Sequence, residues 1–302
     1  MHLLRSRASR GPMTQMSVAT RRYTLTLSCA GRLGIVAAIS GLVARHQGWI
    51  TEANHYVDPQ SGRLFMRIEI VASSLSVDLP EFRSLILPIA DEYGMKWRVN
   101  DSAERKRVVI LVSKQAHCLY DLLSRWQSKD LNIDIPCVIS NHESYRDLVQ
   151  WHGIPFHHVP VTPDNKAEAY GKVEQLYREA GGEVMVLARY MQILSPEMCE
   201  RLSGQIINIH HSFLPSFIGG KPYHQAHERG VKLIGATCHY VTTDLDEGPI
   251  IEQDVIRIDH ADAPEDLVQY GQDIEKTVLA RGLRYHLEDR VFLNGRKTVV
   301  FR

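Results

Sequence analysis

Two residues that could take part in chemistry, Asn208 and His210, stand at the end of an apolar run, residues 206–209. The run is typical of a buried strand, and side chains at positions i and i+2 of a strand share one face. An asparagine amide can donate to a carbonyl oxygen, and a histidine, with an unperturbed pKa of roughly 6.5, can act as a general acid or base. An Asn-x-His pair can equally be structural, so the spacing alone indicates only a candidate site.

Carboxylates that could complete the site follow in the segment TTDLDEGP, which contains Asp244, Asp246 and Glu247. A carboxylate beside His210 would orient the imidazole and stabilise its protonated form. Asn, His and a carboxylate at one cleft suit attack on a formyl or acyl carbon, with the Asn208 amide stabilising the developing oxyanion. The residues alone leave open which of the three carboxylates has this role.

Other residues that could bind a metal do not form a convincing set. His210 adjoins His211, and His224 and His227 have H-x-x-H spacing, but the glutamate of a zinc-protease motif is missing. The five cysteines are scattered and include no C-x-x-C pair. We therefore expect no metal site and no disulfide framework, and the cysteine pattern favours a reducing cytoplasm.

The composition is that of an ordinary globular protein. The chain has 302 residues, and Lys plus Arg equals Asp plus Glu at 35 each, so the formal net charge is zero. This balance argues against a general nucleic-acid binder. No apolar run approaches the roughly 20 residues needed to span a bilayer, so we expect no membrane partner. Residues 1–20, rich in arginine and free of acid, are interpreted as a disordered extension, with a targeting segment as the alternative.

The second two thirds of the chain, residues 107–302, alternates apolar strands with helices. Such alternation predicts a Rossmann-like, mostly parallel α/β sheet, in which ligands bind beyond the carboxyl ends of the strands. Expected strands are residues 108–112, 135–139, 156–159, 184–187, 205–208, 233–241 and 250–256. The loop after the first of them, SKQAHC, contains no glycine, so a dinucleotide or phosphate cradle is not expected there.

Residues 21–100 have a different pattern. Their strands and helices follow the order βαββαβ, which predicts a ferredoxin-like α+β domain, and the polar residues 101–106 are the expected linker. The segment CAGRLGIVAAISGLVARHQGWI resembles the opening of an ACT domain, a module that pairs enzyme subunits or binds amino acids. Ala30 and Gly31 stand where that family usually has proline and aspartate, which favours packing and dimerisation over ligand sensing.

The segments NIHHSFLPSF and LDEGPII resemble the signature of the folate-dependent formyltransferase fold. This resemblance implies that Asn208, His210 and Asp246 are the catalytic residues. It also implies that the preceding segment binds the folate through main-chain groups and apolar walls. The candidate folate-binding residues are Arg189, Tyr190, Met191, Gln192, Ile193 and Leu194.

An ACT-like domain before this catalytic fold is the layout of the formyltetrahydrofolate deformylases, which the segment KPYHQAHERGVKLIGAT also resembles. The resemblance implies hydrolysis of 10-formyltetrahydrofolate to formate and tetrahydrofolate, with the folate as substrate, no separate cofactor, and a homo-oligomer formed through the ACT-like domain. Two alternatives remain open. One is a formyltransferase acting on a small amine, and the other is a non-catalytic folate-binding protein that senses an amino acid.

Overall fold

The computed structural model describes residues 21–214 and 222–302, and the interpretation of residues 1–20 lies outside these ranges. Contacts within the chain separate it into two units, residues 1–103 and 104–302. Each unit is described by itself.

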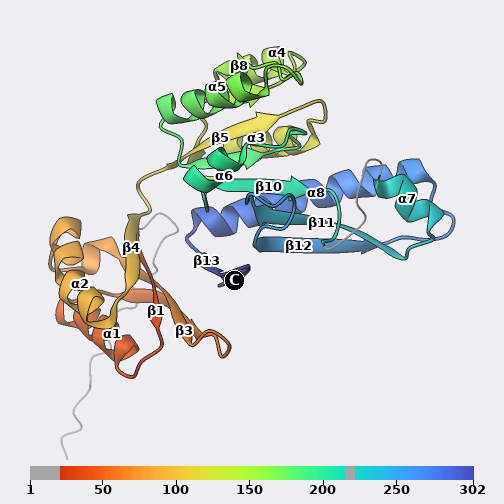
Figure 1. Cartoon of the computed structure of the whole chain (residues 1–302). Helices are drawn as coiled ribbons and strands as arrows, with labels where there is room; N and C mark the ends of the chain where they lie inside the picture. Colours follow the sequence, from red (N-terminus) through yellow and green to blue (C-terminus); the bar gives the residue numbers. More distant parts are fainter. Residues whose placement is uncertain (1–20, 215–221) are drawn as a thin grey trace, which may run out of the picture. The chain divides into compact units, whose positions relative to one another are not determined.

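The first unit contains one antiparallel sheet with the strand order β2-β3-β1-β4 (Figure 1). Its elements are β1 (Arg22–Ala30), α1 (Ile35–Arg45), β2 (Ile50–Val57), β3 (Arg63–Val71), the short 3₁₀ helix η1 (Ala72–Ser74), α2 (Leu79–Tyr93) and β4 (Lys96–Asp101). The predicted βαββαβ order is confirmed. Both helices pack on the sheet in one apolar core, where Ile39 of α1 and Phe82 of α2 meet Leu25 of β1.

Residues 102–105 connect β4, the last strand of the first unit, to β5 of the second unit. Its elements are β5 (Lys106–Val112), α3 (His117–Gln127), β6 (Ile133–Asp134), β7 (Val138–Ser140), α4 (Arg146–Trp151), β8 (Phe156–His158), α5 (Lys166–Glu179), β9 (Val184–Leu187), α6 (Pro196–Arg201), β10 (Ile206–His210), α7 (Pro222–Glu228), β11 (Leu233–Tyr240), β12 (Ile250–Arg257), α8 (Pro264–Leu287), β13 (Val291–Asn294) and β14 (Lys297–Val300).

The main sheet of this unit has the order β12-β11-β10-β9-β5-β7-β8, and β6 pairs with β5. The strands from β10 to β8 run parallel, while β11 and β12 are antiparallel to their neighbours. The predicted mostly parallel α/β sheet is therefore confirmed. Strand β10 lies where the parallel part meets the antiparallel part, so its polar carboxyl end opens at the ligand-binding edge.

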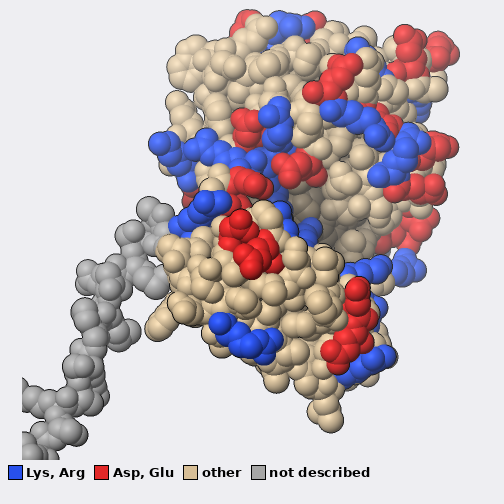
Figure 2. All heavy atoms as spheres, turned by 90° about the vertical axis from the view of Figure 1, so that its left-hand side faces the viewer, with Lys and Arg blue, Asp and Glu red and all other residues tan. Residues whose placement is uncertain are grey.

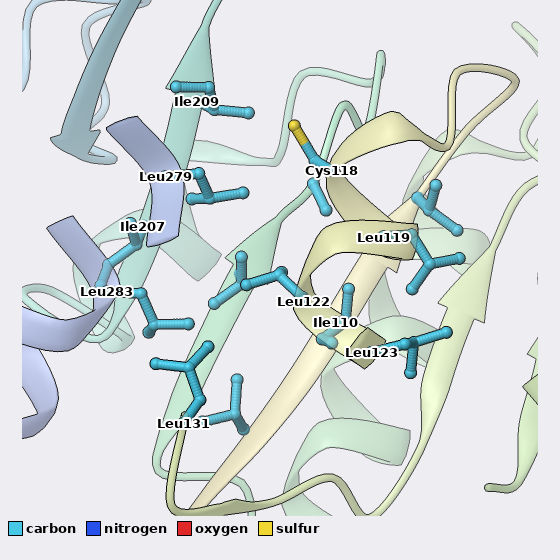
Figure 3. Close-up of a cluster of buried hydrophobic side chains, with 14 of the residues drawn as sticks. Ile110, Cys118, Leu119, Leu122, Leu123, Leu131, Ile207, Ile209, Leu279 and Leu283 are labelled. Carbon is cyan, nitrogen blue, oxygen red and sulfur yellow. The ribbon is translucent and has the colours of Figure 1, made fainter. Parts of the chain in front are cut away.

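Helices cover both faces of the sheet, which explains why its strands are apolar on both sides. Helices α3 and α8 share one core, and Figure 3 shows Leu122 and Leu279 there with Ile110 and Ile207 of the sheet. Helices α5 and α6 share the other core, which contains Val173.

Two expectations about elements were wrong. In place of the strand expected over residues 135–139, β6 ends at Asp134 and β7 begins at Val138. Pro136 lies between them and has no N–H to donate to a strand ladder. Helix α7 was not expected at all. Its apolar residues are only Tyr223 and Ala226, which pack against Ile234 and Leu267, so the short segment shows too little periodicity to predict a helix.

The surface drawn in Figure 2 has basic and acidic side chains interspersed, as the balanced net charge predicts. Among the described residues, no helix combines the length and the apolar character that crossing a membrane requires.

Candidate active site

Strand β10 delivers Asn208 and His210 to the same side of the sheet, as their spacing predicts. The intervening Ile209 points the other way into the core beside α8, while Asn208 and His210 are half-buried and line a cavity. Below them, Ile206 and Ile207 are fully buried. The apolar half of the strand thus holds the polar half in place at the edge of the sheet.

Of the three candidate carboxylates, Asp246 is the one that meets His210. Its Oδ1 atom lies 3.2 Å from His210 Nδ1. Asp244 is exposed, and Glu247 forms an ion pair with Arg296 at 2.6 Å. The geometry therefore identifies Asp246 as the carboxylate beside His210, a choice that the sequence spacing alone left open.

The loop that carries Asp246 is shaped by two backbone constraints. Asp246 has a φ of 57°, in the left-handed region that aspartate tolerates better than most residues. Gly248 packs so tightly that an added Cβ would lie 1.7 Å from the carbonyl oxygen of Tyr240. Strained backbone of this kind is concentrated at functional sites.

The charge state of Asp246 suits a partner for imidazolium. Burial raises the pKa of this carboxyl group, but the hydrogen bond from His210 opposes burial, and the pKa lies well below its usual range. Asp246 is therefore ionised at neutral pH. An ionised carboxylate at Nδ1 leaves the other ring nitrogen of His210 as the proton carrier on the far side of the ring.

His239 is a site residue that the sequence did not reveal. It lies on β11 directly opposite Asn208, and its Nε2 atom is 3.1 Å from Asn208 Nδ2. His239 Nδ1 donates to the carbonyl oxygen of Tyr240 at 2.9 Å, which leaves Nε2 free to accept from the Asn208 amide. A histidine inside an apolar strand was the available signal, but its partner is known only from the register of β10 and β11.

His211 supports His210 from the side. The two rings stack with centroids 5.0 Å apart and planes 27° apart. Burial, followed by the charges of Arg189 and His210, lowers the pKa of His211 to about 4. His211 is therefore neutral at pH 7 and places no positive charge beside the His210 ring.

The segment after β10 is tied to the neighbouring strands. Thr237 Oγ1 donates to the Ser212 carbonyl at 2.9 Å and accepts from the Leu214 N–H at 3.1 Å. Gln253 donates to the same hydroxyl at 2.9 Å. Residues 215–217 of the NIHHSFLPSF motif lie outside the described residues, as does Lys221 at the start of KPYHQAHERGVKLIGAT.

A cavity of about 1030 Å³ contains this group of residues. It is lined by Asn208, His210, His239 and Asp246, by the loop 241–248, and by all six candidate folate-binding residues, 189–194. Its volume is just above the usual range for a site that binds one small organic ligand, ~300–1,000 Å³. Three other surface cavities touch none of the three candidate catalytic residues.

The loop 189–194 combines a fixed backbone with an apolar surface. Met191 N–H donates to Ser113 Oγ at 2.9 Å, and Ser113 N–H donates to the Arg189 carbonyl at 3.2 Å. Leu194 is buried, whereas Met191 and Ile193 are 56% and 66% exposed. Exposed apolar side chains at a cavity are suited to a flat aromatic ligand.

A polar cluster, largely buried apart from the exposed Gln115, lies beside the cavity, and we call it the Glu275 cluster: Gln115, His117, Arg189, Tyr223 and Glu275. Ligand atoms of His117, Cys118 and Glu275 lie within 4.8 Å of one another. However, the guanidinium of Arg189 is 3.3 Å from the Glu275 carboxylate, and burial holds the pKa of the Cys118 thiol well above its usual value. A fixed cation and a protonated thiol make a poor metal site. His224 and His227 are exposed on α7.

The arrangement is suited to attack on a carbonyl carbon. An amide donor, an imidazole backed by an ionised carboxylate, and an apolar cavity for the rest of a substrate are the components that stabilise a tetrahedral oxyanion.

Comparison with known proteins shows to which family this chain belongs. A family model described as formyl transferase matches residues 106–283, more than half of the chain. A formyltetrahydrofolate deformylase from Corynebacterium sp. (strain P-1) is 48% identical over 281 residues, covering 93% of this chain and 98% of the relative. The chain belongs to the formyltetrahydrofolate deformylase family.

Solved structures agree with this family. A crystal structure of a formyltetrahydrofolate deformylase from Pseudomonas syringae pv. tomato matches with a TM-score of 0.93 and 57% identity, covering 94% of this chain and 96% of that one. A glycinamide ribonucleotide transformylase from Symbiobacterium toebii matches with a TM-score of 0.62 and 26% identity, covering 67% of this chain and 97% of that one. The deformylase matches extend over both units of the chain, and they do not favour a transferase or a non-catalytic folate-binding protein.

Proposed function

We propose that this chain hydrolyses 10-formyltetrahydrofolate to formate and tetrahydrofolate. The observation that supports the proposal most strongly is the meeting of Asn208, His210 and Asp246 in one cavity. The chain that contains this cavity matches a deformylase over 93% of its length. The folate is the substrate, and no separate cofactor is proposed.

The reaction begins when water attacks the formyl carbon and the carbonyl oxygen becomes an oxyanion. The Asn208 amide, with one N–H held by His239, directs its second N–H toward that oxyanion. Protonated His210 donates from Nε2 to the same oxygen. Each such donor contributes roughly 10²–10³-fold to the rate.

Asp246 orients the His210 ring and also holds the attacking water in place. It accepts from His210 Nδ1, which orients the ring and stabilises imidazolium. When the tetrahedral intermediate collapses, the bond from the formyl carbon to N10 breaks. His210 gives its Nε2 proton to N10 and takes up the proton that the attacking water loses, or an ordered water passes that proton to N10, so the products are formate and tetrahydrofolate.

The residues 189–194 are proposed to hold the pterin. The main chain of this loop supplies donors and acceptors, and Met191, Ile193 and Leu194 supply apolar walls. Positioning by the pterin is essential because the formyl group itself offers little surface to bind.

An assay without any acceptor tests the proposal. The purified chain should release formate and tetrahydrofolate in equal amounts from 10-formyltetrahydrofolate in buffer alone, and Asn208→Ala should abolish most of the release. Turnover that requires an added amine would contradict hydrolysis and support a transferase.

We also propose that residues 21–100 form an ACT-type domain that pairs subunits, and that residues 107–302 form the catalytic domain. The βαββαβ order and the segment CAGRLGIVAAISGLVARHQGWI support the first assignment. Light scattering at micromolar concentration should give at least a dimer. A monomer under these conditions would contradict the pairing role.

A further inference from the structure

The Glu275 cluster occupies a position where α/β proteins usually bind ligands. Gln115 and His117 follow the carboxyl end of β5, and Arg189 follows the carboxyl end of β9. These two strands are neighbours in the sheet. Crevices beyond the carboxyl ends of such strands are the usual binding places in open α/β sheets. Here the crevice contains protein side chains instead.

The carboxylate of Glu275 is held from three sides. His117 Nε2 is 2.7 Å from Oε2, and the Tyr223 hydroxyl donates to Oε1 at 2.8 Å. Arg189 Nε lies 3.3 Å from Oε2 and also donates to Gln115 Oε1 at 2.9 Å. These residues come from four different segments: the loop after β5 with the start of α3, the loop after β9, α7, and α8.

The side chains that surround the Glu275 carboxylate are largely closed to solvent, whereas Gln115 at the edge of the cluster is exposed. The side chain of Glu275 is 1% exposed and that of His117 is 11% exposed. Burying one carboxylate and one guanidinium is tolerable only because they pair with each other and with neutral donors. Arg189 Nη1 is buried without a protein partner among the described residues, a position that suits a water molecule.

The cluster also adjoins the reaction centre. Arg189 lines the cavity that contains Asn208 and His210. The Tyr223 ring lies 6.4 Å from the ring of His211, which stacks on His210. The cluster therefore forms the boundary of the reactive cavity on the side of β5 and β9.

We propose that the Glu275 cluster determines the acceptor: by filling the crevice beyond β5 and β9, it leaves room at the formyl carbon for water and excludes amines. This inference rests on the proposed hydrolysis. An amine that reached the site would attack the formyl carbon through its nitrogen and lose one proton. The bond to N10 would break, and N10 would take up a proton, giving a formylated amine and tetrahydrofolate.

The variant His117→Ala is the sharpest test, because it opens the crevice and leaves Glu275 paired with Arg189 and Tyr223. The purified variant and the unmodified chain are each incubated with 10-formyltetrahydrofolate and glycinamide, and formylglycinamide and formate are measured together. The ratio of transfer to hydrolysis should rise by roughly 10–100-fold in the variant, the size of effect that a change in pocket shape produces. Tyr223→Phe, which opens no space, should leave the ratio unchanged.

A second pair of variants separates this role from general damage. Leu122→Ala, in the apolar core on the same helix as His117, also removes buried packing but does not touch the crevice, so it should not alter the ratio. If His117→Ala does not fold, the ratio of transfer to hydrolysis is measured in Gln115→Ala instead. This variant removes the side chain that accepts from Arg189. A ratio equal to that of the unmodified chain in a folded crevice variant would overturn the inference. No formate from the unmodified chain would instead overturn the proposed hydrolysis.

Discussion

Asp246 and Asp244 stand two residues apart on one loop, yet only Asp246 contacts His210. The two residues also differ in backbone conformation, because Asp246 has a left-handed φ of 57° and Asp244 does not have a positive φ. The same loop leaves Asp244 exposed at the cavity. The two residues therefore form a natural pair of test and control positions.

Asp246→Asn should lower kcat by roughly 10²–10⁴-fold, because an amide cannot stabilise the His210 imidazolium as a carboxylate does. KM for the folate should change little, since the pterin contacts are elsewhere in the cavity. Asp244→Asn should leave kcat within about threefold of the unmodified value, the scale of a substitution at an exposed polar position. Steady-state formate release measures both, and equal losses in the two variants would contradict the assignment.

At the scale of elements, the apolar runs of the sequence predicted nearly all strands of both units, because burial on two faces leaves a continuous apolar signal. Asn208 and His210 were predictable because both lie on one strand. His239 and Glu275 were not, because their partners are 31 and 158 residues away and meet them only through strand register and helix packing. The proline that divides β6 from β7 was visible in the sequence but was not used.

Gly248 provides a prediction for the loop as an element. Gly248→Ala should lower kcat by roughly 10²-fold. The added Cβ would clash with the Tyr240 carbonyl oxygen, and the resulting shift of the loop would move the Asp246 carboxylate away from His210. Gly171→Ala is the control: it lies within α5, where an added Cβ meets nothing within 4 Å. That control should stabilise the chain by about 0.5–1 kcal/mol and leave kcat unchanged. Full activity of Gly248→Ala would show that the tight turn does not position Asp246.

At the scale of the whole molecule, the catalytic unit depends on ion pairs between elements on the α5 side of its sheet. Glu174 of α5 accepts hydrogen bonds from Arg201, the last residue of α6, and from Arg178 of α5 itself. Hydrogen bonding from Arg201 outweighs burial and lowers the pKa of Glu174 to about 2. A lowered carboxyl pKa stabilises the fold above the unfolded value of about 4.3, and this stabilisation is lost as pH falls toward 2.

Glu174→Gln should therefore lower the free energy of unfolding at pH 7 by about 1–2 kcal/mol, a value reduced because both arginines are half exposed. The difference from the unmodified chain should shrink at pH 3. Glu179→Gln, an exposed position on the same helix, should change stability by less than about 0.5 kcal/mol at either pH. Urea unfolding at the two pH values measures all three proteins, and a pH-independent loss in Glu174→Gln would exclude the charge as its cause.

Isotope labelling provides the most direct test of the central claim, that water attacks a formyl carbon held at Asn208, His210 and Asp246. A single turnover of 10-formyltetrahydrofolate in ¹⁸O-labelled water, with no amine present, should yield formate carrying one solvent oxygen, and Asp246→Asn should form it far more slowly. Absence of labelled formate from the unmodified chain, or labelled formate at an undiminished rate from Asp246→Asn, would contradict the account.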